Sequence, residues 1–174
     1  MDFERFSPIR FIIEKRINLN FTNLKTMKIT VGALTPDDCQ EWETLYRGYA
    51  EFYKVPMTSE ILDTVWSWIF EEYYGFYALV AKNGNNRPIG LMHFREMPSP
   101  LRGKKVGFLD DLFVLPESRG TGVVDEMFKK LSKESAKNGW PFVRWITAED
   151  NYRGRGVYDR TAEKTKWVTY QMSV

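Results

Sequence analysis

Apolar positions in the first half of the chain recur every three or four residues, which is the spacing of two amphipathic helices. Thr35 can cap the first helix, Pro36 suits its first position, and Pro56 breaks it. Thr58 or Ser59 begins the second helix. The predicted apolar faces consist of Trp42, Leu45, Tyr46, Tyr49, Phe52 and Tyr53 in the first helix, and of Ile61, Leu62, Val65, Trp66, Ile69 and Phe70 in the second.

Shorter apolar runs bounded by turn residues predict the strands, at residues 27–31, 76–81, 89–97, 106–114, 142–147 and 167–172. Two more helical patterns cover residues 123–138 and 151–163, and two glycines weaken the second of them. The predicted order is β-α-α-β-β-β-α-β-α-β. This order places the chain in the α/β class, as an α+β mixed sheet with helices on both faces.

The length of 174 residues fits one domain. We expect that domain to span residues 27–174, because residues 27–31 form the first predicted strand. Residues 1–26 are then an N-terminal extension. Two interpretations of the extension stay open: an ordered segment, or a start assigned ahead of the true one at Met27.

Composition narrows the class of protein. Hydrophobic residues make up 43% of the chain and aromatic residues 16%, which supplies a core and disfavours disorder. The net charge of +2 is spread over mixed signs and lacks the basic stripe of a nucleic-acid-binding protein. One cysteine, Cys39, and one histidine, His93, exclude an intramolecular disulfide and argue against a zinc site. With no bilayer-length apolar run and no signal-peptide pattern, we expect a cytoplasmic protein without metal, nucleic acid or membrane partner.

The segment LDDLFVLPESRGTGVV, residues 109–124, carries the clearest chemical signal. After a strand and a turn, Arg119, Gly120, Thr121 and Gly122 open a helix. Glycines let the backbone approach a ligand, and a helix start supplies unpaired N–H donors and partial positive charge. The pattern predicts a phosphate or pyrophosphate site, although a tight strand–helix turn without a ligand is the plainer interpretation. It is neither a P-loop nor a dinucleotide fingerprint, because the required lysine and third glycine are missing.

This loop resembles the Arg-x-x-Gly-x-Gly/Ala cofactor motif of the GCN5-related N-acetyltransferases, the GNAT family. A second stretch is similar in spacing to the family's Asn-x-x-Ala-x-x-Leu-Tyr pattern, with Asn151 and Tyr158 at its ends. The predicted element order from about residue 27 onward also resembles that fold. The paired aspartates followed by a Pro-Glu turn look most like the diamine acetyltransferase and Hpa2-like branch. Two residues depart from the motifs: Val124 replaces Gly or Ala, and Gly154 replaces Ala.

The resemblance implies an N-acetyltransferase that moves the acetyl group of acetyl-CoA to a primary amine by direct attack, without an acyl-enzyme. The expected acceptor is a small polyamine-like or amino-containing molecule. Two alternatives stay open, a protein or peptide lysine acetyltransferase and a non-catalytic CoA-binding regulatory module. The family also forms dimers, which leaves a homodimer open.

The resemblance assigns the cofactor site to three parts of the chain. The main-chain groups of Leu112 and Val114 would pair with the pantetheine arm like an added strand. Asn151 would contact the cofactor, cap its own helix, or do both. The pyrophosphate would lie on the loop and helix start formed by Arg119, Gly120, Thr121, Gly122, Val123 and Val124.

The resemblance also suggests the catalytic groups. Tyr158 would be the general acid that protonates the departing thiolate, since a phenol has a pKa near 10. Asp110 would be the water-mediated base and Asp111 a contact for the substrate ammonium. A regular strand points these neighbours to opposite faces, so the β-bulge that the family implies would have to change their geometry. The plainer interpretations are a packing tyrosine, a structural pair of aspartates and, for His93, a buried or edge histidine.

Overall fold

The computed structural model describes residues 28–174, and the predicted extension at residues 1–26 lies outside the described residues. Within residues 28–174, five strands form one sheet in the order β1-β2-β3-β4-β5. Strands β1 to β4 are antiparallel neighbours, and β5 runs parallel to β4. The predicted mixed sheet is therefore confirmed. The strands are β1 Thr30–Ala33, β2 Phe76–Lys82, β3 Pro88–Ser99, β4 Lys104–Val114 and β5 Val143–Arg144.

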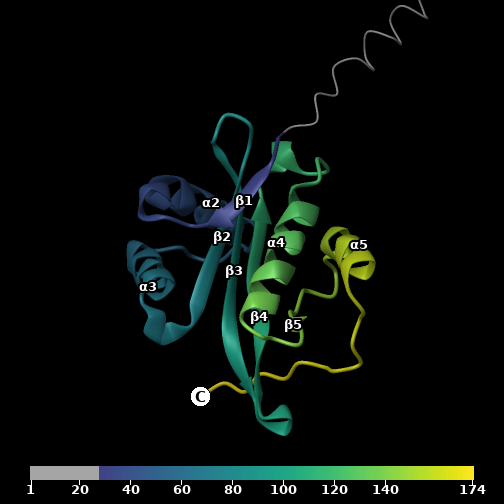
Figure 1. The fold of residues 1–174 in the computed structure, drawn as a ribbon. Helices are drawn as coiled ribbons and strands as arrows, with labels where there is room; N and C mark the ends of the chain where they lie inside the picture. The colour runs from purple at the N-terminus through teal and green to yellow at the C-terminus, as the bar shows by residue number, and fades with distance from the viewer. Residues whose placement is uncertain (1–27) are drawn as a thin grey trace, which may run out of the picture.

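Helices cover both faces of this sheet (Figure 1), with α2 and α3 on one side and α4 and α5 on the other. Each side has its own apolar core, one between the sheet and the α2–α3 pair and one between the sheet and α4. None of the described helices combines the length and the apolar character needed to cross a membrane. The helices are α2 Cys39–Tyr53, α3 Ser59–Phe70, α4 Val123–Lys137 and α5 Tyr152–Thr161.

The helix boundaries lie close to the capping and helix-breaking residues predicted from the sequence. The Thr58 hydroxyl accepts a hydrogen bond from the N–H of Ile61 at 3.3 Å and so caps α3. Helix α2 ends where Lys54 adopts a left-handed conformation, φ 56°, two residues before Pro56. The predicted start at Pro36 becomes a separate 3-10 turn, after which α2 begins at the exposed Cys39.

Of the two strands predicted near the C-terminus, one is absent and the other is shorter than predicted. Residues 167–172 have no regular structure, and Trp167 and Tyr170 are 80% and 89% exposed. The strand predicted at 142–147 shrinks to Val143–Arg144. Apolar alternation favours an extended chain, but a strand also needs a neighbour to pair with, and the described residues offer none to 167–172.

Gly107 holds β5 against β4, and an alanine there is expected to destabilise the protein. The N–H of Gly107 donates to Phe142, and an added Cβ would come within 2.7 Å of the Trp140 ring and 2.9 Å of Val143. Overpacking of this kind costs about 1–3 kcal/mol. Urea unfolding should show the Gly107→Ala midpoint fall with an unchanged m-value, whereas Gly32→Ala in β1, where an added Cβ has free space, should stay near wild type. An unchanged midpoint for Gly107→Ala would contradict this packing.

Candidate active site

The C-terminal half of β4 has one open edge. Strand β5 pairs with β4 only at Gly107 and Phe108, and no described strand continues beyond them on that side. The N–H of Leu115 bonds to β3. Alternation along β4 therefore turns the N–H and C=O groups of Leu112 and Val114 away from β3, into the opening. This edge has the donors and acceptors that an extended ligand needs in order to bind like an added strand.

The glycine loop, residues 119–122, lies at the end of this edge and leads into α4. Gly120 and Gly122 have φ of 81° and 89°, a left-handed conformation that favours glycine, although an added Cβ would meet nothing within 4 Å at either position. Gly122 is the N-cap of α4 and brings no side chain to cap it. The N–H groups of the first helical turn therefore face open space, which suits an anion.

Two side chains of the glycine loop fasten the loop to its surroundings. The Arg119 Nε–H donates to the carbonyl of Val114 at 2.9 Å, and the guanidinium lies 5.7 Å from the centre of the Phe113 ring. The Thr121 hydroxyl donates to the carbonyl of Ser118 at 2.7 Å. The Arg119 side chain thus occupies the Val114 carbonyl, one of the hydrogen-bond acceptors on the open edge of β4. Thr121 lies outside the pocket lining and stabilises the turn.

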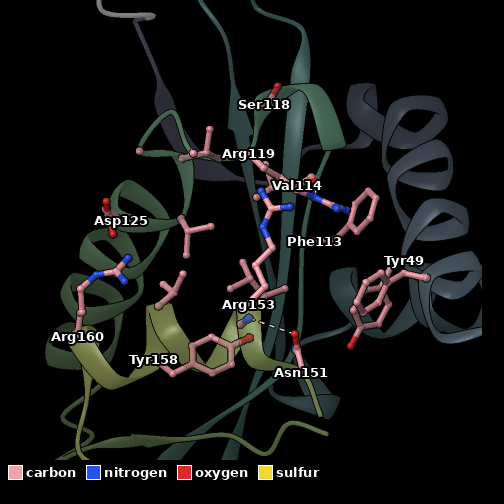
Figure 2. A pocket seen from close by; sticks show the side chains of 18 of the residues that line it. Tyr49, Phe113, Val114, Ser118, Arg119, Asp125, Asn151, Arg153, Tyr158 and Arg160 are labelled. Carbon is pink, nitrogen blue, oxygen red and sulfur yellow. Dashed lines mark hydrogen bonds between the residues drawn. The ribbon is translucent and has the colours of Figure 1, made fainter.

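A pocket of about 370 Å³ lies between β4, the start of α4 and α5, with the end of α2 on its far side (Figure 2). It brings together nine of the twelve residues that the sequence singled out. Thr121, Asp110 and Asp111 are the three that lie outside its lining. The nine are Leu112, Val114, Arg119, Gly120, Gly122, Val123, Val124, Asn151 and Tyr158.

Val124, the departure from the loop motif, lines the pocket and packs against the α4 core. Its neighbour Val123 is buried and fills that core. Neither side chain belongs to the glycine loop itself, so the loop keeps its open backbone.

Asn151 caps α5 with its amide oxygen and bonds to Thr147, before the helix, with its amide nitrogen. Its Oδ1 accepts the N–H of Gly154 at 3.1 Å, and its Nδ2 donates to the Thr147 hydroxyl at 2.9 Å. An added Cβ on Gly154 would lie 2.6 Å from the Asn151 side chain. The glycine that replaces the motif's alanine is therefore the residue that fits this cap. Of the two roles left open for Asn151, capping is the one that the structure shows.

Tyr158 faces the pocket from α5, with its ring packed edge-on against Trp145 and Phe128. Burial, and then the neighbouring phenol of Tyr53, raise the pKa of the Tyr158 hydroxyl. The hydroxyl stays protonated at neutral pH and is available as a hydrogen-bond and proton donor.

A β-bulge in β4 brings both aspartates to one face of the sheet. Leu109 and Asp111 pair with consecutive residues of β3, which leaves Asp110 as the extra residue and confirms the implied bulge. The Asp110 carboxylate accepts from Arg95 Nε at 3.1 Å, while the Asp111 carboxylate lies 2.9 Å from His93 Nδ1. Since Arg95 and His93 are two residues apart on β3, both carboxylates lie on the α2–α3 face.

The two carboxylates differ in electrostatic environment. Burial raises the pKa of Asp110, and the charge and hydrogen bond of Arg95 oppose that shift. Burial, and then the charge of the nearby Asp111 carboxylate, raise the pKa of the Tyr49 phenol, and Tyr49 lines the pocket. Burial thus inclines the Asp110 carboxyl group to take a proton, whereas the Asp111 carboxylate has His93 Nδ1 as its hydrogen-bond partner.

Sequence reasoning missed Arg153 and Arg160, which line the pocket together with Arg119 and the carboxylate of Asp125. Figure 2 shows Arg153 extending from α5 across the pocket toward the glycine loop. Both arginines share a helix face with Val157, at positions i, i+4 and i+7, and that spacing was a readable signal. The run Arg153-Gly-Arg-Gly156 resembles a nucleic-acid motif in isolation, which hid the signal.

Comparison with known proteins agrees with this geometry. Residues 41–162 match the model of the acetyltransferase (GNAT) family. The D-amino-acid N-acetyltransferase HPA3 of Saccharomyces cerevisiae is 26% identical over 147 residues, which cover 83% of this chain and 90% of the relative.

Solved structures share the fold at lower identity. The ribosomal-protein-alanine N-acetyltransferase of Brucella melitensis has a TM-score of 0.71 at 20% identity, over 84% of this chain and 99% of its own. The aminoglycoside 6'-N-acetyltransferase AAC(6')-Ih of Acinetobacter baumannii has a TM-score of 0.69 at 16% identity, over 84% and 99%. The predicted enzyme class, an acetyl-CoA-dependent N-acetyltransferase, is confirmed by the family match and the named relatives. The chain belongs to the GNAT family of acetyltransferases.

Proposed function

We propose that this protein binds acetyl-CoA in the pocket between β4 and α5 and transfers its acetyl group directly to a small primary amine. One observation carries the proposal. The open edge of β4, the glycine loop at the start of α4 and the Tyr158 hydroxyl meet in one pocket. A chain of amides ending in a pyrophosphate fits the first two features, and a thiolate leaving group fits the third.

In this proposal each part of the cofactor site has a separate task. The free N–H and C=O groups of Leu112 and the N–H of Val114 bind the extended arm, because the Val114 carbonyl is taken by Arg119. The N–H groups at the start of α4 bind the pyrophosphate, and the pocket arginines add positive charge. Asn151 caps α5 and also contacts the cofactor from its place in the pocket lining.

The catalytic groups act on two protons. The attacking amine must be neutral, and Asp110 accepts its proton through a water, helped by the burial that raises the pKa of this carboxyl. The amine nitrogen forms its new bond to the acetyl carbon, and the bond from that carbon to sulfur breaks. As the amide forms, the nitrogen releases its second proton to solvent. Tyr158 then gives its proton to the departing thiolate, and solvent restores it.

The acceptor end of the pocket favours a small amine. The rings of Tyr49, Phe52 and Tyr53 line that side, and Asp111 lies directly behind Tyr49. Aromatic faces and a carboxylate attract an ammonium group before it loses its proton. The yeast relative is named for D-amino acids, and amino acids belong with polyamines in the class of acceptors proposed here.

An acceptor screen tests the proposal. Purified protein with acetyl-CoA should release free thiol in the presence of spermidine, D-amino acids or L-amino acids, faster than with a lysine-containing peptide. A preference for the peptide would move the assignment to a lysine acetyltransferase. Tight CoA binding without thiol release for any acceptor would identify a non-catalytic module. An absence of CoA binding would reject the site itself.

Arg153 is expected to contribute to cofactor affinity. A charge-assisted hydrogen bond is worth about 1.5–3 kcal/mol, so Arg153→Gln should raise the Kd for CoA about tenfold or more. Arg155→Gln is the matched control, because Arg155 lies on the same helix, outside the pocket lining, and bonds to the Glu149 carbonyl. Isothermal titration calorimetry should find its Kd within about twofold of wild type. Equal losses for both variants would point to overall charge rather than a contact.

A further inference from the structure

A buried polar chain runs from α2 to the bulge of β4. The Trp42 Nε1–H lies 2.9 Å from His93 Nε2, and His93 Nδ1 lies 2.9 Å from the Asp111 carboxylate. The Trp42 and His93 side chains are shielded from solvent, with His93 at 0% exposure. The chain therefore joins the hydrophobic core to a carboxylate next to the pocket.

The hydrogen-bond partners fix the protonation of His93. An indole N–H can only donate, so His93 Nε2 must be the acceptor. The proton of the neutral imidazole then sits on Nδ1, which donates to Asp111. A second proton on Nε2 would face the Trp42 N–H, donor against donor, in a site without water access. His93 is consequently neutral and held in the Nδ1–H tautomer.

Two phenols from α2 complete the surroundings of Asp111. Burial, and then the charge of the nearby Asp111 carboxylate, raise the pKa of both Tyr46 and Tyr49, so both phenols stay protonated beside that carboxylate. The hydrogen bond from His93 Nδ1 holds the Asp111 carboxylate in place. Tyr49 in turn belongs to the pocket lining.

We propose that Trp42 and His93 are positioning residues that keep Asp111 as a fixed negative charge behind Tyr49, so that the enzyme selects acceptors that arrive as ammonium ions. The selection of acceptors rests on the proposed function, but the state of His93 does not. The other charged groups near this chain are Asp110 and Arg95, which pair with each other. Their pairing leaves Asp111 as the carboxylate available to attract the acceptor.

The single histidine in the sequence makes the first test direct. Protein labelled with ¹⁵N-histidine gives signals from one imidazole only. We expect a protonated-type Nδ1 and an unprotonated-type Nε2 in the folded protein, because Nε2 accepts from Trp42 and Nδ1 faces the Asp111 carboxylate. An Nε2–H tautomer, or protons on both ring nitrogens, would overturn the proposal without reference to any substrate.

The second test follows the acceptor. Trp42→Phe keeps an aromatic ring but removes the donor to His93, so the histidine signals should change. The KM for a cationic acceptor should rise about tenfold while the Kd for CoA stays constant. Trp66→Phe is the control, since the ring centres of Trp66 and Trp42 lie 4.9 Å apart in the same core. Wild-type signals and KM in Trp42→Phe, or an equal KM change in Trp66→Phe, would contradict the positioning role.

These outcomes are separable from failure of the proposed function. If no acceptor supports thiol release, the acceptor assignment fails, and the wild-type histidine spectrum still decides whether Trp42 and His93 fix Asp111. If Trp42→Phe unfolds, the same spectrum of the wild-type protein carries the test.

Discussion

Replacing Asp110 with asparagine is expected to lower kcat/KM by about 10²- to 10³-fold, the usual contribution of a general base. Asparagine keeps the size of the side chain but cannot accept the proton of the attacking amine. The effect should appear in kcat, with the Kd for CoA near wild type, because Asp110 lies outside the cofactor pocket. Asp63→Asn, an exposed change on α3, is the matched control and should leave kcat/KM unchanged.

The pH dependence checks the same assignment. Asp110 works as a base only when ionised, so kcat/KM should rise with pH through its pKa and then level off. Arg95 lowers that pKa by its charge and hydrogen bond. Arg95→Gln should therefore move the rising limb to higher pH, and Asp110→Asn should abolish it. A limb that survives in Asp110→Asn would assign the base to another group.

Tyr158→Phe is expected to lower kcat about 10²-fold while CoA affinity and the unfolding midpoint remain near wild type. Phenylalanine keeps the packing against Trp145 and Phe128 and removes only the proton that the thiolate would take. Tyr152→Phe removes a hydroxyl from the exposed side of the same helix and should have no effect on kcat. An unchanged rate in Tyr158→Phe would leave this residue a packing tyrosine and nothing more.

The sequence predicted those parts of the fold that local chemistry determines. Helix-capping, helix-breaking and glycine residues act on the chain within a few positions, so the helices and the glycine loop could be located from the sequence. Examples are Thr58, Pro56 and the glycines of residues 119–122. The strand predicted at 142–147 is shorter than expected and the one at 167–172 is absent, for the opposite reason. Their length depends on pairing partners elsewhere in the chain, which an apolar alternation does not reveal.

In the candidate site too, features set by local sequence could be predicted, and features set by contacts between distant residues could not. The glycine loop was predicted from its residues and Tyr158 from the resemblance to the family's pattern, whereas the placement of Asp110 beside Arg95 depends on a register shift between β3 and β4. The pairing of Trp42 with His93 joins residues 51 positions apart and has no sequence signal of its own. The helical spacing of Arg153 indicated its place on the pocket side of α5, but the run Arg153-Gly-Arg-Gly156 drew attention to a nucleic-acid motif instead.

A crystal structure of the protein with CoA bound would decide whether the pocket between β4 and α5 holds the cofactor. We expect the pyrophosphate against the N–H groups of Gly122, Val123 and Val124, and the pantetheine arm along the open edge of β4. We also expect the thiol within hydrogen-bonding reach of the Tyr158 hydroxyl. CoA bound elsewhere on the molecule, or in this pocket with its thiol directed away from both Tyr158 and Asp110, would rule out the proposed site.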